Sequence, residues 1–558
     1  AAKSGAGRRL DPSWLGIGIE VEVAQDATID NGSVIETNVE SGALLGSGGV
    51  RITADRIMIS GGPKILKFVE THPTAELPFA GVRSNVTSKS TAASSGGISL
   101  NATSIDIKSL GQIETTTTSA GNAGHISLQA SGDIVLDSGF IRSASATSSG
   151  NAGNIVLASS TGDVRLAPGL LASQTDNSSG NAGNITLRAS QGHVSVATSS
   201  FVTSQANNSS GNAGSITIEA PHGDVMLEGT TVLNSINKDT GTLGGIQVTA
   251  NNLFLTGSRI LENNVAQQAA GNIVIMLEGR LNLTGDSFIQ TGTDGPANAA
   301  HLIIRARDIL ITENSSLLTE PTSTSRGAAG AIDLSAQTLT IQNGGKISAT
   351  TFGISPTATG GSITIKVTDH VMMSDNASIT ASSRGPADAG NISINAGRQL
   401  ELHNASSITT TTTLGQANGG DIGIQAIDRV RLVNNSEIST SVKGTEGSGG
   451  NIFIDPKVVI LEGSNVTANA VTGAGGNITF VTPLFLADAA SRVSASSERG
   501  PSGTVTIQSP TANLSGAVGQ LVSKTSPPQI LLQNRCVASA GGEQSTFILA
   551  GRDTLPIE

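Results

Sequence analysis

The stretch that decides the fold reads SSGNAGNI, and it occurs at residues 148–155 and again at residues 178–185. A near copy, SSGNAGSI, occupies residues 209–216. Each copy joins a small polar turn to the start of a triplet in which two aliphatic residues flank a variable one. Because the copies lie about thirty residues apart, they indicate that the chain repeats one structural unit at that period.

The aliphatic triplet after this turn recurs along most of the chain. From Ile98 to Val505 it takes fourteen steps over 407 residues, about 29 residues each. We expect the first residues of these triplets to face inward and to stack as one ladder. They are Ile98, Ile126, Ile155, Ile185, Ile216, Ile246, Ile273, Leu302, Ile332, Ile363, Ile392, Ile422, Ile452, Ile478 and Val505.

Each repeat holds two further short apolar segments. A second triplet follows some nine residues after the first, as at residues 134–136, and a third segment follows a small turn, as at residues 376–382. Alternation with period two is typical of strands, whereas a helical solenoid would need longer runs with a period of 3.6. Glycine, threonine and β-branched residues also oppose helices. The sequence therefore predicts an all-β parallel β-helix with three short strands in each coil and about 15 to 17 coils.

The phase of the repeat divides the chain into five segments. The C-terminal one begins where the repeat stops, and its adjacent Pro527 and Pro528 break strand pairing. We predict an N-terminal extension over residues 1–15, the first coils over 16–60, a loop excursion or irregular coil over 61–95, the regular β-helix over 96–514, and a cap or docking segment over 515–558.

The composition indicates a thin aliphatic core and excludes several classes of partner. Hydrophobic residues make up 37% of the chain, but aromatic residues only 2%. The net charge of −11 comes without a basic cluster, which argues against nucleic acid as a partner. No apolar run is long enough to span a membrane. With a single cysteine, the chain has no internal disulfide framework and no cysteine-based zinc site.

The asparagines of the repeated turn predict a structural ladder. Glycine supplies the positive φ that a sharp corner requires, and asparagine tolerates it. We expect the amide of each asparagine to hydrogen-bond to the equivalent amide one coil away. The predicted ladder consists of Asn122, Asn151, Asn181 and Asn212. A phosphate-binding role for the turn would need a following helix, and here a strand follows.

One polar column has the residue types of a catalytic or metal site. Asp133, Asp163, His193 and Asp224 precede the second strand in four consecutive coils, which would stack them about 5 Å apart. Two carboxylates so placed could serve a retaining glycosidase, or they could hold a divalent metal together with His193. Later coils place a mixture of polar residues there, which is typical of a solvated turn: Asn252, Arg280, Asp308, Thr338, His370, Gln399 and Arg429. We therefore expect no catalytic residue, metal or cofactor.

The lone cysteine, Cys536, lies in the tail stretch RCVASAGGEQSTFILAGRDTLP at residues 535–556. We expect it to be a packed small residue, and an intermolecular disulfide in an oxidising environment is the alternative.

The aliphatic triplets, the GNAGNI turns and this tail resemble the large exoproteins of bacterial two-partner secretion, the filamentous-haemagglutinin-like family of cyanobacteria and related Gram-negative bacteria. The resemblance covers most of the chain and is most specific in the tail. It implies a right-handed β-helix that an outer-membrane transporter exports and that acts at the cell surface or outside the cell. The implied roles are adhesin, filament or matrix component, with further copies of the chain, assembled end to end or laterally, and surface glycans as other partners.

We therefore expect a non-catalytic structural or adhesive rod. The alternative is a polysaccharide-acting lyase or glycosidase on the same scaffold, because a fold does not determine a function. Such an enzyme would need long loops that build a cleft over charged side chains. The sequence has one long excursion, at residues 64–86, and small or polar residues dominate between the aliphatic positions.

Overall fold

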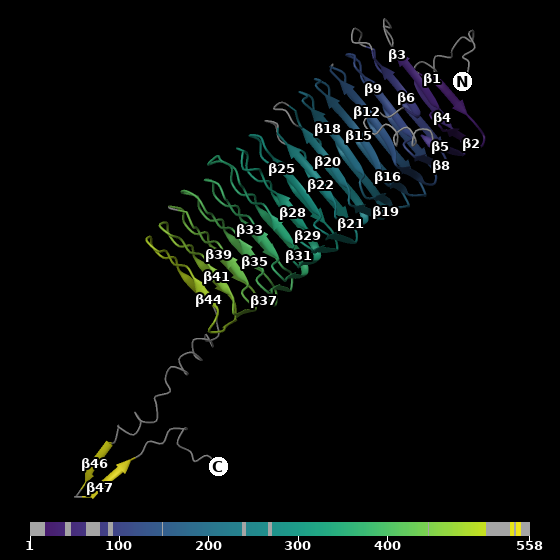
Figure 1. Ribbon diagram of the computed structural model, residues 1–558. Coiled ribbons are helices and arrows are strands. Elements are labelled where there is room, and N and C mark those ends of the chain that lie inside the picture. The colour runs from purple at the N-terminus through teal and green to yellow at the C-terminus, as the bar shows by residue number, and fades with distance from the viewer. Residues whose placement is uncertain are drawn as a thin grey trace, which may run out of the picture.

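The computed structural model describes residues 17–39, 46–62, 79–87, 93–147, 149–236, 241–265, 270–444, 446–508, 536–540 and 543–547. Every named element within these ranges is a strand. From β1 to β45 the strands stack in parallel and form a right-handed parallel β-helix, a long rod that Figure 1 shows from the side. The expected fold class is confirmed.

Each coil contributes three strands, and the strands form two long sheets. The large sheet has 29 strands and combines first and second strands, and the third-strand sheet has 16 strands. The coil that begins with β45 contributes only that first strand to the described residues. In four coils the first and second strands are continuous: β19 (Ile216–Glu228), β21 (Ile246–Thr256), β29 (Ile332–Ile341) and β31 (Ile363–Met373).

The other first strands are β1 (Ile17–Glu22), β4 (Gly49–Thr53), β7 (Ile98–Ala102), β10 (Ile126–Ala130), β13 (Ile155–Ser159), β16 (Ile185–Ala189), β23 (Ile273–Leu277), β26 (Leu302–Arg305), β33 (Ile392–Asn395), β36 (Ile422–Gln425), β39 (Ile452–Asp455), β42 (Ile478–Val481) and β45 (Val505–Gln508). The other second strands are β2 (Asp26–Ile29), β5 (Arg56–Ser60), β8 (Ser104–Lys108), β11 (Ile134–Asp137), β14 (Val164–Leu166), β17 (Val194–Val196), β24 (Arg280–Thr284), β27 (Asp308–Ile311), β34 (Gln399–Leu402), β37 (Arg429–Val433), β40 (Val458–Glu462) and β43 (Leu484–Ala487). The third strands are β3 (Val34–Val39), β6 (Gly81–Val86), β9 (Gln112–Thr117), β12 (Gly139–Ala146), β15 (Gly169–Asp176), β18 (Phe201–Asn207), β20 (Thr231–Ile236), β22 (Arg259–Asn264), β25 (Phe288–Thr293), β28 (Ser316–Thr319), β30 (Lys346–Ser348), β32 (Ser378–Thr380), β35 (Ser407–Thr409), β38 (Glu437–Ser439), β41 (Asn465–Thr467) and β44 (Arg492–Ser494).

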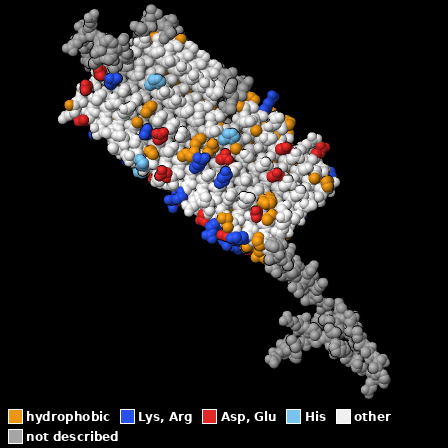
Figure 2. Space-filling view, turned by 180° about the vertical axis from the view of Figure 1, so that it is seen from behind, with side chains coloured by type: hydrophobic (Ala, Val, Ile, Leu, Met, Phe, Trp, Pro, Cys, Tyr) orange, Lys and Arg blue, Asp and Glu red, His pale blue; other side chains and the backbone are white. Residues whose placement is uncertain are grey.

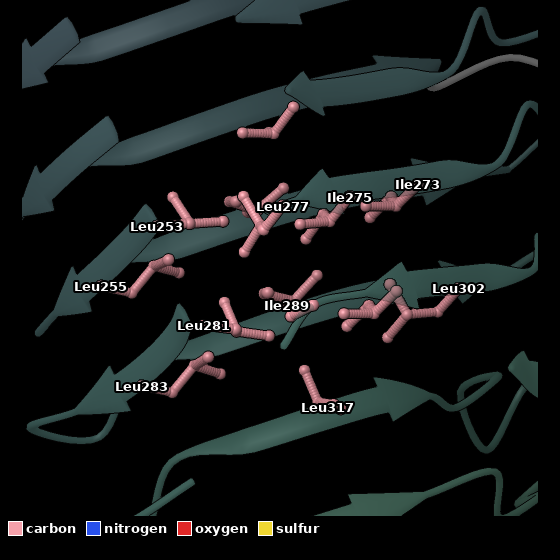
Figure 3. Close-up of a cluster of buried hydrophobic side chains, with 14 of the residues drawn as sticks. Leu253, Leu255, Ile273, Ile275, Leu277, Leu281, Leu283, Ile289, Leu302 and Leu317 are labelled. Atoms are coloured by element: carbon pink, nitrogen blue, oxygen red, sulfur yellow. The ribbon is translucent and has the colours of Figure 1, made fainter. Parts of the chain in front are cut away.

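The predicted aliphatic ladder lies inside the rod, in register from coil to coil. Ile363, for example, pairs with Ile332 on one side and with Ile392 on the other. Every member from Ile98 to Ile478 is buried, whereas Val505 is 43% exposed because no later described coil covers β45. Figure 3 shows part of this core, in which side chains of both sheets meet inside the coils.

A column of buried hydroxyl residues runs beside the aliphatic core on the inner face of the third-strand sheet. The Ser173 hydroxyl donates to the carbonyl of Gly153 at 3.0 Å and accepts the N–H of Gly183 at 2.7 Å. Each such hydroxyl therefore links its third strand, through hydrogen bonds, to the backbone of turns that precede first strands. The buried members are Ser84, Thr115, Ser143, Ser173, Ser204, Thr291, Thr319, Thr410 and Thr440.

Glycine is required in the GNAG turns for a different reason from the positive φ that we expected. None of the described glycines of these turns has a positive φ. Instead, a Cβ on Gly153 would lie 2.0 Å from the carbonyl oxygen of Gly124, and one on Gly183 would lie 2.2 Å from that of Gly153. Successive turns stack in direct backbone contact, and this close approach is what excludes a side chain.

The segment boundaries are only partly described. Within the segment over residues 61–95, β6 pairs with β3 and β9 as a third strand, and the boundaries of the segment stay predictions. The N-terminal extension over residues 1–15 lies outside the described residues. Of the predicted cap over 515–558, the structure describes one antiparallel pair, β46 (Cys536–Ala540) with β47 (Glu543–Phe547). Among the described residues, no helix is long and apolar enough to cross a membrane.

Candidate functional site

The structure stacks Asp133, Asp163, His193 and Asp224 in one column at the start of the second strands. The first three side chains accept a hydrogen bond from the backbone of the next coil, and Asp224 accepts one from the side-chain amide of Asn252 at 2.7 Å. The N–H of Asp163 donates to Asp133 Oδ1 at 2.9 Å, that of His193 to Asp163 Oδ1 at 2.8 Å, and that of Asp224 to His193 Nδ1 at 3.0 Å. The column therefore joins coil to coil.

Arg165 neutralises the two aspartates that could have formed a catalytic pair. Its guanidinium lies 3.4 Å from Asp133 Oδ2 and 2.5 Å from Asp163 Oδ2. Partial burial alone would raise the pKa of Asp163, but the N–H of His193 and the guanidinium of Arg165 outweigh burial and hold that pKa below its ordinary value. A glycosidase acid needs a raised pKa, so Asp163 is shifted in the unfavourable direction for that role.

The same column does not form a metal site. In the part of the chain that the structure describes, no three His, Cys, Asp or Glu side chains are placed to hold a metal ion.

The turn asparagines form a related ladder, with a different contact from the one we expected. The backbone N–H of Asn151 donates to Asn122 Oδ1 at 3.0 Å, that of Asn181 to Asn151 Oδ1 at 2.7 Å, and that of Asn212 to Asn181 Oδ1 at 2.8 Å. The side-chain oxygen of each asparagine thus accepts a hydrogen bond from a backbone N–H of the next coil. We had expected it to bond to the side-chain amide of the equivalent asparagine. The ladder satisfies turn N–H groups that no strand neighbour reaches.

The backbone of Cys536 lies in β46, opposite Phe547. Its side chain is outside the described residues, so packing and an intermolecular disulfide both stay predictions.

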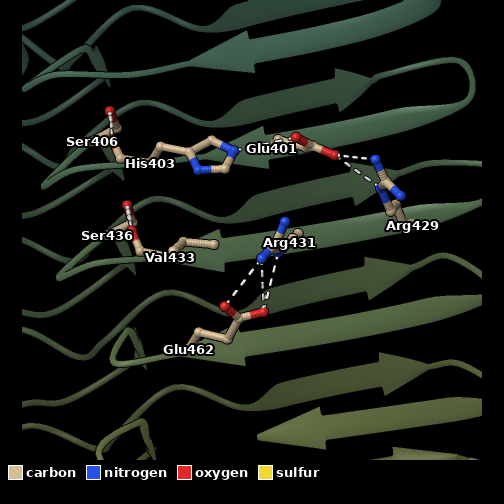
Figure 4. A network of polar contacts seen from close by, with 8 residues as sticks. All are labelled: Glu401, His403, Ser406, Arg429, Arg431, Val433, Ser436 and Glu462. Carbon is tan, nitrogen blue, oxygen red and sulfur yellow. Dashed lines mark hydrogen bonds and ion pairs between the residues drawn. The ribbon is translucent and has the colours of Figure 1, made fainter. Parts of the chain in front are cut away.

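Sequence reasoning missed an ion-pair network on the outer face of the large sheet (Figure 4). Glu401 in β34 receives Arg429 Nε at 2.9 Å and lies 3.2 Å from His403 Nε2, while Arg431 Nη2 contacts both carboxylate oxygens of Glu462 at 3.0 and 3.1 Å. Burial raises the pKa of Glu401, but His403 and Arg429 outweigh it and leave the pKa low. Acidic and basic side chains also lie side by side on the face shown in Figure 2.

A groove with a repeating lining runs along the outer face of the third-strand sheet. Two cavities of about 490 Å³ each share Thr409 and Thr411, so they form one continuous depression, here called the hydroxyl groove. It lies between β28 and β44, on the face toward the viewer in Figure 1. Its floor consists of Ser378, Thr380, Ser382, Thr409, Thr411, Ser439, Ser441, Thr467 and Asn469.

The walls of the hydroxyl groove carry charges and one aromatic ring. Arg384 lies over the Phe352 ring, 5.1 Å from its centroid, and Lys346 Nζ lies 2.8 Å from Glu320 Oε1. Lys443 adds a third cation. Three anions, Glu320, Glu437 and Glu498, also line the groove, so its three cations and three anions leave no net charge. The sequence signal for this floor is the pattern hydroxyl-x-hydroxyl at the end of third strands, as in TTT at residues 409–411.

Comparison with protein-family models and with curated proteins found no match. The fold therefore defines the class of this protein, a β-solenoid repeat protein built as a parallel β-helix.

Proposed function

We propose that the protein is a non-catalytic structural or adhesive rod of a bacterial surface or extracellular matrix. One observation carries the proposal: the polar columns that run along the rod join neighbouring coils. In the Asp133 column Asp133 and Asp163 accept backbone N–H groups and pair with Arg165, which stabilises the stack. These contacts hold the pKa of Asp163 below its ordinary value, whereas a general acid needs a raised pKa. A rod that repeats one unit is suited to span distance.

The resemblance to the two-partner exoproteins supports a place outside the cell. We propose that an outer-membrane partner exports the chain from a Gram-negative-type bacterium. Its proposed partners after export are further copies of itself and surface glycans, and the tail resemblance at residues 535–556 is the basis for this assignment.

A lyase or glycosidase on the same scaffold is the second candidate, and the hydroxyl groove favours it. Glu437 and Glu498 both line that groove, so a polysaccharide lying in it would pass carboxylates.

An assay for cleavage distinguishes the two candidates. The full chain is incubated with neutral glycans and with polyuronates, and reducing ends and unsaturated products are measured. We expect no product with any substrate. Product formation that Asp163→Asn abolishes would place an active site in the Asp133 column. Product formation that Glu437→Gln abolishes would place it in the groove, and either result would overturn the non-catalytic proposal.

A further inference from the structure

We infer that the hydroxyl groove binds a linear, uncharged polysaccharide that lies along the rod axis. This inference rests on the adhesive role proposed above and names its ligand. It follows from the donors, the charge and the repeat of the groove, which are taken in turn.

Four hydroxyl groups of the floor donate their protons within the groove. Ser439 donates to Ser441 at 3.0 Å, Ser441 to Thr467 at 3.2 Å, and Thr467 to Glu437 Oε1 at 3.4 Å. In the neighbouring coils Thr409 donates to Thr380 at 3.2 Å. A hydroxyl has one proton and two acceptor lone pairs. With its proton used, a hydroxyl such as that of Thr409 offers lone pairs, and these match a ligand that is rich in O–H donors.

The charge of the groove indicates an uncharged ligand. Because three cations and three anions line it, a polyanion and a polycation would each meet repulsion. Phe352 adds an apolar ring that Arg384 holds in place, a surface on which the C–H face of a sugar can pack.

The repeat of the groove indicates a polymer. The third strands place equivalent hydroxyls in register, Thr380 opposite Thr409 and Thr409 opposite Ser439. From β28 to β44 there are six steps between coils, so the groove spans roughly 29 Å at about 4.8 Å per step. A polysaccharide with a short repeat of its own can contact the same donors and acceptors at successive coils, which a single small molecule cannot.

Calorimetric titration of the full chain tests the inference. The probes are cellohexaose and maltohexaose as neutral chains, polygalacturonate as a charged chain, and an extended neutral peptide. We expect a neutral hexasaccharide to bind, with an affinity that added salt does not change, because no net charge is neutralised. Binding of the peptide or of polygalacturonate alone, or of no probe at millimolar concentration, would overturn the inference.

Two matched variants locate the site. Thr409→Val with Thr411→Val removes two floor hydroxyls and keeps β-branched residues. We expect this double variant to bind the hexasaccharide more weakly, by up to about tenfold. Thr186→Val with Thr217→Val removes two half-buried hydroxyls from the outer face of the large sheet and should leave binding unchanged. Equal affinity in the wild type and the groove variant, or a loss only in the control, would contradict the assignment.

A third variant, Phe352→Ala, should also weaken binding, and thermal melts of all variants show that they are folded. The test separates the two proposals. Binding without cleavage supports both, cleavage overturns the non-catalytic role, and a folded rod that binds no neutral glycan overturns this inference while the rod function stands.

Discussion

Glu262 is a residue whose chemistry conflicts with its position. It stands in the interior hydroxyl column, in register with Asn234 and Thr291, and is 1% exposed. Among the described residues, neither of its carboxylate oxygens has a hydrogen-bond partner. Burial raises its pKa well above the ordinary value. Because only the protonated acid carries an O–H, as serine and threonine do, the neutral form is the one that suits the column.

Glu262→Thr should therefore stabilise the rod. At neutral pH we expect the free energy of unfolding to rise by about 1–3 kcal/mol, the cost of an unsatisfied buried polar group. A raised folded-state pKa means that the contribution of Glu262 to stability is present below its unfolded-state pKa and is lost as pH rises through the folded-state pKa. The gain in the variant should accordingly be larger at pH 8 than at pH 4, as measured by urea unfolding.

Glu278→Thr is the control for this comparison, because Glu278 is exposed. A gain from Glu262→Thr that is the same at both pH values would show that ionisation of Glu262 is not the cause.

The turn glycines provide a second prediction at this scale. In Gly153→Ala the new Cβ would meet the Gly124 carbonyl at 2.0 Å, so two stacked turns must separate. We expect a loss of about 1–3 kcal/mol in the free energy of unfolding. Gly423 lies in β36 with no atom within 4 Å of a built Cβ, and Gly423→Ala should be neutral or stabilising by up to about 1 kcal/mol. Equal losses in the two variants, measured by thermal unfolding, would contradict contact between turns as the reason for Gly153.

At the scale of the strand, position along the rod decides what an aliphatic side chain contributes. Ile363 in β31 is fully buried between Ile332 and Ile392, whereas Val505 in β45 is 43% exposed. Ile363→Ala should cost about 2–5 kcal/mol of unfolding free energy, since it leaves a cavity among packed neighbours. Val505→Ala should cost much less. Chemical denaturation of the two variants measures the difference, and similar losses would mean that the core does not depend on stacking.

The strands also show what the sequence could predict. The aliphatic ladder was predictable because inward and outward residues of the first strands differ in kind, as Ile126 and Ser127 do. The third strands lack that contrast. In the run of threonines at residues 409–413, Thr410 faces the interior and Thr409 and Thr411 face the groove, so the two hydroxyl columns could not be told apart before the coil was known.

For the candidate sites, the sequence could predict which residues stack but not which atoms they contact. A period of about thirty residues placed Asp133 above Asp163 and Asn122 above Asn151. It could not show that their oxygens accept backbone N–H groups of the next coil, because that contact depends on the rise and twist between coils. The prediction of a positive φ for the turn glycines was wrong for a related reason. The contact that excludes a side chain at Gly153 lies between residues of different coils.

The described rod from β1 to β45 is a one-dimensional stack, since pairing in it joins each strand to its counterpart in a neighbouring coil. Stability in such a stack depends on neighbours, so the end coils have less of it than the middle. We expect amide hydrogen exchange to be slowest in β23 to β31 and fastest in β1 to β3 and in β42 to β45. Uniform protection along the rod would contradict this expectation and would indicate that the rod unfolds as one unit.

The direction of the strand pairing has a mechanical consequence. The hydrogen bonds between strands link one coil to the next, so a force that separates the two ends pulls on them along their own direction, one boundary at a time. A stacked coil occupies about 4.8 Å of the rod. The same 29 or so residues, released and extended, span roughly 100 Å. Under tension the molecule would therefore lengthen in many equal steps, each absorbing work, and a cell attached through such a tether would be slowed before it was detached.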